Sequence, residues 1–437
     1  MTGVYSLEDA HLLERELCAI FPSEWLREKA RATGLIKRER KIDPVTIFWV
    51  LAISYGTFLQ RTLATLKRNY ETASNKSLSD SSWYYRFTPE LVAFLRACVS
   101  RGLEYLAQDP GRTLNERLSP FQDVLIQDST IIRLHEKLAK IWPAARSHRA
   151  AAGVKLGVLT SAIVSGPKSV SLYAETTNDL KTLRIGPWIK DRILLIDLGF
   201  YKYQVFTRIK ENGGYFVSRV KSNANPLILE VNRSYRGRSI DIRGKHLQDV
   251  LINLKRQVLD VDVEVAFNRR AYQGKKRKDM ERFRLVAVYN AEDEKYRLYF
   301  TNISPDLLKP EEIARLYGAR WEVEILFKEL KSKYALDVVP TSNPQIIEAF
   351  IWIAVLTLLI SRRIHTIIRR LNPGAKVVRF THLRWATIFS EKAGFLLTAI
   401  LDYLGIKNTF ETSLNVYSSE ALDPHVNRKR FTEEWWA

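Results

Sequence analysis

Residues 192–199 read Arg-Ile-Leu-Leu-Ile-Asp-Leu-Gly, and this stretch decides the fold class of the 437-residue chain. Four apolar residues followed at once by an acid are typical of a strand that is buried on both faces and ends at a turn. A similar run, three apolar residues and Gln127 over residues 124–127, precedes Asp128. Open α/β sheets carry their sites at the carboxyl ends of such strands, so Asp128 and Asp197 are candidate site residues. For either acid alone, capping the turn after its strand is the more common role.

Similar short runs surround these two strands. A helical segment, residues 200–213, separates residues 192–199 from the run at 215–221, and strands that alternate with a helix indicate a mixed α/β sheet. Residues 1–116 instead repeat apolar residues at three- and four-residue spacing, which predicts helices, and residues 44–66 are the most apolar of them. The predicted strands are residues 124–129, 154–164, 169–176, 192–199, 215–221, 261–265, 283–290 and 296–302.

The charge of the chain points to a polyanionic partner. Lys and Arg number 68 against 48 Asp and Glu, which gives a net charge of +20 and a pI of about 9.8. Residues 201–300 contribute +10 and residues 351–400 contribute +7, so the basic character is regional. Nucleic acid is therefore the first candidate partner, and the basic cluster at residues 275–278 must be exposed to solvent.

The sequence gives no support to nucleotide hydrolysis, Rossmann redox chemistry or zinc hydrolysis. The sequence contains no GxxxxGK[ST], GxSxG or HExxH motif and no GxGxxG after a strand, and its seven histidines are scattered. The two cysteines, Cys18 and Cys98, fit a reducing compartment. The longest apolar run, residues 349–360, is too short for a membrane span and predicts a buried helix. We expect a cytoplasmic protein without a signal peptide.

A third candidate element is a helix over residues 310–334. At 100° per residue, Tyr317, Arg320, Glu324 and Lys331 fall within an arc of about 60°, beside the apolar face of the same helix. A helix packed on the sheet would hold these four side chains at the rim of a groove. A solvated Arg320–Glu324 pair would explain two of them but not the other two.

The spacing Tyr317-x2-Arg320-x3-Glu324-x6-Lys331 resembles the Tyr/Arg/Glu/Lys signature of DDE transposases of the fourth insertion-sequence family. Residues 125–130 and 194–200 resemble the strands that carry the first and second aspartate of that family. Leu198 stands where the family often has Arg, so this position is not expected to contact phosphate. The 127 residues that separate Asp197 from Glu324 fit the β-rich insertion of the family.

The resemblance implies an RNase H-like mixed α/β sheet with a β-rich insertion and helical N- and C-terminal regions. It implies cut-and-paste transposition, with cleavage of the transposon ends through a hairpin followed by strand transfer. It further implies that Asp128, Asp197 and Glu324 are catalytic and hold two Mg²⁺ ions, for which Mn²⁺ substitutes. The residues implied to bind nucleic acid are Tyr317, Arg320 and Lys331.

The partners implied are the double-stranded DNA of the transposon ends and of the target, bound by a homodimer on paired ends. No membrane is involved, and the protein is expected in the cytoplasm with the nucleoid. An apolar stripe in the C-terminal region could serve the dimer or pack on the chain itself: Phe395, Leu396, Leu397, Ile400, Leu401 and Leu404. Tyr296 and Tyr299 fall where the family places an aromatic residue near a flipped base, although simple packing is commoner on a strand.

The predicted division has five segments: a helical N-terminal DNA-binding domain (1–116), the first part of the catalytic core (117–221), the β-rich insertion (222–306), the second part of the core (307–370) and a basic helical C-terminal region (371–437).

Two other functions stay open at this point. One is a domesticated, non-enzymatic DNA-binding protein, and the other is a structure-specific nuclease on the same fold.

Overall fold

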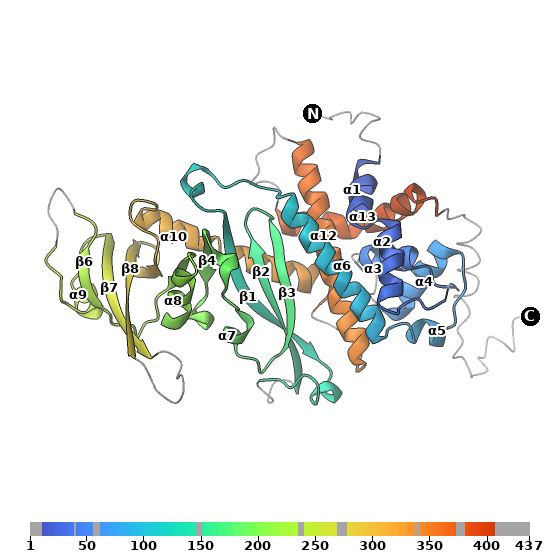
Figure 1. The fold of residues 1–437 in the computed structure, drawn as a ribbon, viewed down its shortest axis with the longest axis horizontal. Helices are drawn as coiled ribbons and strands as arrows, with labels where there is room; N and C mark the ends of the chain where they lie inside the picture. The colour runs from blue at the N-terminus through green and yellow to red at the C-terminus, as the bar shows by residue number, and fades with distance from the viewer. Residues whose placement is uncertain are drawn as a thin grey trace, which may run out of the picture. The chain divides into compact units, whose positions relative to one another are not determined.

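The computed structural model describes residues 11–38, 41–55, 62–145, 151–234, 240–268, 278–336, 339, 341–372 and 381–406. The chain divides into two compact units. One contains Met1–Gly102, Ser332–Leu336 and Asn343–Ala437, and the other contains Leu103–Lys331 and Asp337–Ser342. The N- and C-terminal helical regions thus belong to one unit, and the sheet belongs to the other (Figure 1).

The helical unit is built around α3 (Pro44–Ser54), whose side chains are all buried. The Asp43 carboxylate caps this helix by accepting a hydrogen bond from the Thr46 amide at 2.8 Å, and Pro44 occupies the first turn. The single helix predicted over residues 44–66 is wrong, because a second helix begins after Thr62, whose side chain caps it. The other helices of this unit are α1 (Leu12–Ile20), α2 (Ser23–Ala32), α4 (Leu63–Ser74), α5 (Asp80–Tyr84), most of α6 (Pro89–Gln108), α12 (Pro344–Leu371) and α13 (His382–Tyr403).

The longest helix, α12, contains the apolar run that was predicted to be buried. Among the described residues it is the one helix of sufficient length and hydropathy to cross a membrane, but 83% of its most apolar window is buried inside the protein. Asn343 caps its start and Pro344 fills the first turn. The prediction of a buried helix is confirmed, and α12 is a core helix of the helical unit.

The other unit contains one nine-stranded mixed sheet in the order β3-β2-β1-β4-β5-β9-β8-β7-β6. β1 pairs in parallel with β4, β4 pairs in parallel with β5, and the remaining neighbours are antiparallel. This mixed α/β architecture confirms the fold class predicted from the sequence. The strands are β1 (Asp123–Leu134), β2 (Ala152–Ser161), β3 (Gly166–Ala174), β4 (Arg192–Ile196), β5 (Tyr215–Arg219), β6 (Leu227–Val231), β7 (Val258–Asn268), β8 (Lys278–Asn290) and β9 (Lys295–Thr301).

The β-rich residues 222–306 extend this same sheet. Their last strand, β9, pairs with β5 through Val217 and Thr301. A cluster of phenylalanines covers the junction, and the rings of Phe206 and Phe216 stack with centroids 4.5 Å apart. Phe206 belongs to α8 (Tyr203–Glu211), which packs against β5 and lies near β4 in Figure 1. The remaining helices of this unit are α7 (Asp179–Thr182), α9 (Leu247–Ile252), α10 (Pro310–Gly318) and α11 (Trp321–Lys328).

Two strand predictions need correction. β1 continues to Leu134, so Asp128 lies in the middle of a strand and not at its end, because β2 pairs with β1 far beyond the point where β4 stops. β6 was not predicted, because it is a short edge strand whose pairing is interrupted by a bulge. Three residues of the basic cluster, 275–277, lie outside the described residues, whereas Lys278 begins β8 and is exposed.

A buried ion pair between β7 and β8 stabilises the part of the sheet that residues 222–306 form. The guanidinium of Arg284 in β8 donates two hydrogen bonds to Asp260 in β7, at 2.7 and 2.8 Å. The same guanidinium donates to the carbonyls of Ile303 and Leu308, which lie just before α10. Arg284 therefore connects the sheet extension to the segment that leads into the helices α10 and α11.

We expect Asp260→Asn to lower the free energy of unfolding of this region by about 3–5 kcal/mol, because it leaves a buried guanidinium without its counter-charge. Urea denaturation of the two proteins measures the difference. Glu230→Gln is the matched control, since its ion pair with Arg282 at 2.5 Å is half-exposed and contributes at most about 1 kcal/mol. Equal losses for the two variants would contradict this expectation.

Candidate active site

The two predicted aspartates occupy equivalent positions on neighbouring strands. The parallel pairing of β1 with β4 ends at Gln127 opposite Ile196, so Asp128 and Asp197 are the next residue on each strand. The Ser129 amide donates to the Asp128 carboxylate at 2.7 Å. Asp197 begins a short 3-10 turn, η5 (Leu198–Phe200), and accepts from the Gly199 amide at 3.3 Å. The two carboxylates therefore meet where the parallel pairing ends.

The helix predicted over residues 310–334 is not continuous. α10 ends at Gly318 and α11 begins at Trp321, and the amides of Ala319 and Arg320 bond to carbonyls only three residues back, as in a 3-10 turn. A π-helical segment, η6 (Glu329–Lys333), then follows α11 and contains Lys331. The arithmetic of 100° per residue holds only within each piece, so the prediction of one continuous helix is wrong, and a face shared by all four side chains stays a prediction.

Arg320 nevertheless brings the three predicted acids together. Its guanidinium lies 3.6 Å from the Asp128 carboxylate and 4.0 Å from the Asp197 carboxylate, measured between the nearest N and O atoms. The same side chain donates a short hydrogen bond to Glu324 on the first turn of α11. The Arg320–Glu324 pair expected from the sequence is thus one part of a four-residue cluster drawn from β1, β4 and α11.

Tyr317 is buried, with only 8% of its surface exposed. Its hydroxyl donates to the carbonyl of Ile196, the residue before Asp197, at 3.3 Å. Its ring lies beside that of Tyr299, with centroids 5.3 Å apart. Burial raises the pKa of Tyr317 to about 12, opposed by the nearby charge of Arg320. Tyr317 therefore joins the end of α10 to the end of β4, and its contact with nucleic acid stays a prediction.

Three further residues were carried over from the resemblance. Lys331 is half-buried in η6. Tyr299 is buried in β9, and Tyr296 donates its hydroxyl to the carbonyls of Leu254 and Arg256 at 2.9 and 2.7 Å. Both tyrosines make packing contacts inside the protein, and a role near a flipped base stays a prediction.

The electrostatics of the site disfavour the ionised form of Asp128. Burial, together with the negative charges of Asp197 and Glu324, raises the pKa of Asp128 to about 6. The Ser129 amide and the Arg320 guanidinium act in the opposite direction. An acid held in this state is stabilised by any additional positive charge placed beside it.

The donor set fits a hard divalent cation. Asp128, Asp197 and Glu324 offer only carboxylate oxygens, which are the ligands that Mg²⁺ prefers. Within the described part of the chain, no three His, Cys, Asp or Glu side chains are already close enough to form a metal cage. Mg²⁺ is commonly held by one or two carboxylates together with the phosphates of a substrate, so a preformed cage is not required.

Comparison with known proteins agrees with this geometry. Residues 119–360 match the family model described as the transposase DDE domain. The chain belongs to the DDE transposase family. The matched segment is more than half of the chain and includes β1, β4, α10, α11 and the six predicted site residues.

Individual transposases resemble most of the chain. The transposase of insertion sequence element IS231F from Bacillus thuringiensis subsp. israelensis is 24% identical over 378 residues, which cover 79% of this chain and 78% of the relative. The transposase of insertion sequence element IS1151 from Clostridium perfringens is 22% identical over 384 residues, with 80% of each chain covered. These matches confirm the DDE transposase assignment, and the narrower Tyr/Arg/Glu/Lys signature stays a prediction.

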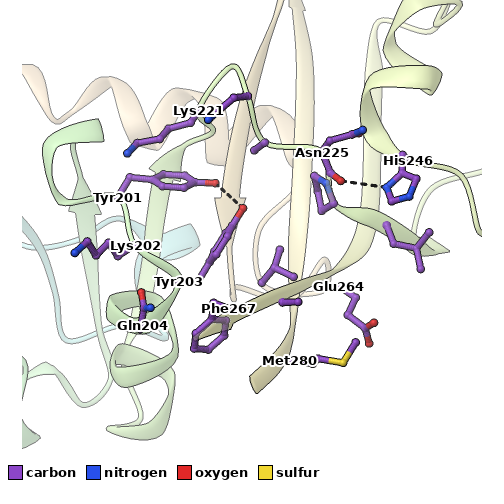
Figure 2. A pocket seen from close by; sticks show the side chains of 16 residues that line it. Tyr201, Lys202, Tyr203, Gln204, Lys221, Asn225, His246, Glu264, Phe267 and Met280 are labelled. Atoms are coloured by element: carbon purple, nitrogen blue, oxygen red, sulfur yellow. Dashed lines mark hydrogen bonds between the residues drawn. The ribbon is translucent and has the colours of Figure 1, made fainter. Parts of the chain in front are cut away.

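A pocket of about 690 Å³ lies beyond the turn that Asp197 begins (Figure 2). The hydroxyl of Tyr201 donates to that of Tyr203 at 3.2 Å, and the ammonium of Lys221 lies 5.2 Å from the centre of the Tyr201 ring. Lys202 and His246 add further basic side chains to the wall. Sequence reasoning missed this pocket, although the run Tyr201-Lys202-Tyr203 directly after the second aspartate was a visible signal.

We expect Asp128→Asn to stabilise the cation-free protein above pH 6. The carboxyl ionises near pH 3.8 when unfolded and near pH 6 when folded, so the folded state binds more protons between these values. The free energy of unfolding of the wild type therefore falls by roughly 2–3 kcal/mol as the pH rises through that window. The Asp128→Asn variant has no carboxyl at this position and does not lose this stability. Thermal unfolding with a chelator should give a higher Tm for the variant at pH 7.5 and no difference near pH 4. A variant that melts at or below the wild-type temperature at pH 7.5 would contradict this.

Proposed function

We propose that this transposase catalyses metal-dependent cut-and-paste transposition, in which the transposon ends are cleaved through a hairpin and then joined to target DNA. The observation that carries the proposal is the convergence of Asp128, Asp197 and Glu324 around Arg320. The DDE family match supports the same chemistry.

The three acids would hold two Mg²⁺ ions, with Mn²⁺ as a substitute. When bound, two such ions supply Lewis-acid stabilisation of the attacking and leaving oxygens of a phosphodiester. The protein contributes the geometry: the β1–β4 pairing sets the spacing of the two aspartates, and α11 adds Glu324. The buried Tyr317 holds the end of β4 in place through the Ile196 carbonyl.

Arg320 and Lys331 would bind the phosphates of the reacting strand. A guanidinium forks onto two phosphate oxygens, whereas an ammonium provides a point charge. Since Arg320 contacts all three acids, a phosphate bound to it would lie beside the cation site. The lysines at the rim of the neighbouring pocket, Lys202 and Lys221, would extend this basic surface along the DNA.

The partners of the proposed reaction are the double-stranded DNA of the transposon ends and of the target. We propose that a homodimer holds the paired ends and that the protein works in the cytoplasm, associated with the nucleoid. The apolar stripe of α13 supports this in part, because Ile400 and Leu401 are buried within the helical unit while Phe395 is 75% exposed. The exposed part of the stripe is the surface offered to a second copy.

We expect Asp128→Ala, Asp197→Ala and Glu324→Ala each to abolish cleavage of transposon-end DNA while end binding stays within a few-fold of wild type. The acids contribute ligands for the cations, whereas the basic surface contributes the affinity for DNA. Gel assays of cleavage and binding with Mg²⁺ measure both. Full cleavage by any one variant would remove that residue from the site.

The same assays separate the two alternative functions. A wild-type protein that binds ends but never cuts them with Mg²⁺ or Mn²⁺ is a DNA-binding protein without enzymatic activity. A protein that cuts ends but makes no strand-transfer product from a pre-cleaved end is a structure-specific nuclease.

We expect Arg320→Ala and Lys331→Ala to slow hairpin formation by about a hundredfold, with little change in end binding, because small misplacements of a reacting strand cost rate more than affinity. The measurement is the fraction of nicked end converted to hairpin over time at saturating protein. Lys328→Ala removes the same charge from an exposed position of α11 and serves as the matched control. Wild-type conversion by Lys331→Ala would leave this lysine without a catalytic role.

A further inference from the structure

A second charged cluster lies next to the two aspartates and takes no part in the chemistry proposed above. It consists of Ser129 in β1, Lys155 in β2 and Asp179 at the start of α7. One oxygen of the Asp179 carboxylate accepts from the Ser129 hydroxyl at 3.1 Å and from the Lys155 ammonium at 2.8 Å. Lys155 also donates to the Thr177 carbonyl at 2.5 Å, and only 8% of its side chain is exposed.

The sheet register explains how Lys155 reaches this position. Lys155 lies opposite Ile131, and Gly157 lies opposite Ser129. Residues two apart on a strand share a face, so the lysine side chain can run diagonally past Gly157 toward Ser129. A Cβ at Gly157 would already lie 3.2 Å from the Tyr173 ring, and the absence of a side chain there keeps this part of the face open.

The cluster touches the neighbours of both catalytic aspartates. Ser129 follows Asp128 directly, and its amide is the group that hydrogen-bonds the Asp128 carboxylate. The second oxygen of Asp179 faces the turn after Asp197: a Cβ placed on Gly199 would lie 3.5 Å from this oxygen and 3.8 Å from an Asp197 oxygen. One carboxylate on α7 is therefore in reach of the strand that carries Asp128 and of the turn that Asp197 begins.

We propose that Asp179, held in place by the buried Lys155, is a positioning residue that fixes Asp128 and Asp197 relative to one another for divalent-cation binding. This inference rests on the proposed function, since it assigns a supporting role at the same site. Groups that hydrogen-bond behind metal ligands determine the orientation of those ligands, and their loss typically lowers metal affinity about 10–100-fold. The buried lysine donates to the Asp179 carboxylate at 2.8 Å and holds its orientation, so the two residues act as one element.

The test is direct Mn²⁺ binding to the full chain without DNA, measured by electron paramagnetic resonance of the free ion. Asp179→Asn keeps the size of the side chain but removes its charge, and we expect Mn²⁺ affinity to fall about 10–100-fold. Ser129→Ala removes one of the two hydrogen bonds to Asp179 and should weaken Mn²⁺ binding less. Ser129→Thr retains the hydroxyl and should restore wild-type affinity.

Glu175→Gln is the matched control. Glu175 pairs with Arg133, farther along β1, at 2.5 Å and is buried, but it does not reach the aspartates. Its loss should lower thermal stability and leave Mn²⁺ affinity unchanged. This comparison separates a positioning role from a general loss of packing.

Mn²⁺ affinity of Asp179→Asn within twofold of wild type would overturn the proposal. Where Asp179→Asn does not fold, Ser129→Ala decides, and an affinity equal to that of Ser129→Thr would overturn it. A wild-type protein without saturable Mn²⁺ binding that Asp128→Ala removes would overturn this inference, whereas the proposed function is decided separately by the cleavage assays with end DNA.

Discussion

The parallel pairing of β1 with β4 is the constraint on which the rest of the site depends. The three central pairs, which join residues 124–126 to residues 193–195, are apolar and buried, so the hydrophobic effect fixes which residue lies opposite which. A slip of one residue would turn every side chain of a strand to the opposite face and separate the two aspartates. The pairing ends after Gln127 and Ile196, and the first residue beyond it on each strand is an acid. The position of the charge is thus set by apolar packing.

Bringing three carboxylates together costs stability, and the surrounding residues limit that cost. Arg320 contacts all three acids, and the Ser129 amide donates to Asp128. These groups do not cancel the effect of burial and mutual repulsion, because the pKa of Asp128 remains raised to about 6. A site that binds a multivalent cation and an anionic substrate requires such uncompensated charge. The protein trades stability for function at this position.

Much of this arrangement could be predicted from the sequence, because it depends on local patterns. The two aspartates follow largely apolar runs that are typical of buried strands, and Glu324 follows Arg320 by four residues at the start of a helix. The break at Ala319 and Arg320 and the π-helical segment at Lys331 could not be predicted, because the apolar periodicity continues through both. The contact of Lys155 with Asp179 depends on the antiparallel register of β1 and β2 and on an open position at Gly157, and neither leaves a pattern in a single sequence.

The order of the sheet has a consequence for the protein during its synthesis. One side of β5 pairs with β4, and its other side pairs only with β9. The third acid, Glu324, follows the second, Asp197, by 127 residues. A ribosome adds about 5–20 residues per second, so roughly 6–25 s separate the emergence of Asp197 from that of Glu324. Throughout this interval the nascent chain carries two of the three acids, and the edge of β5 is unpaired until β9 has been synthesised. A message that ends before codon 324 therefore yields a product that lacks Glu324 and has an incomplete set of the three acids.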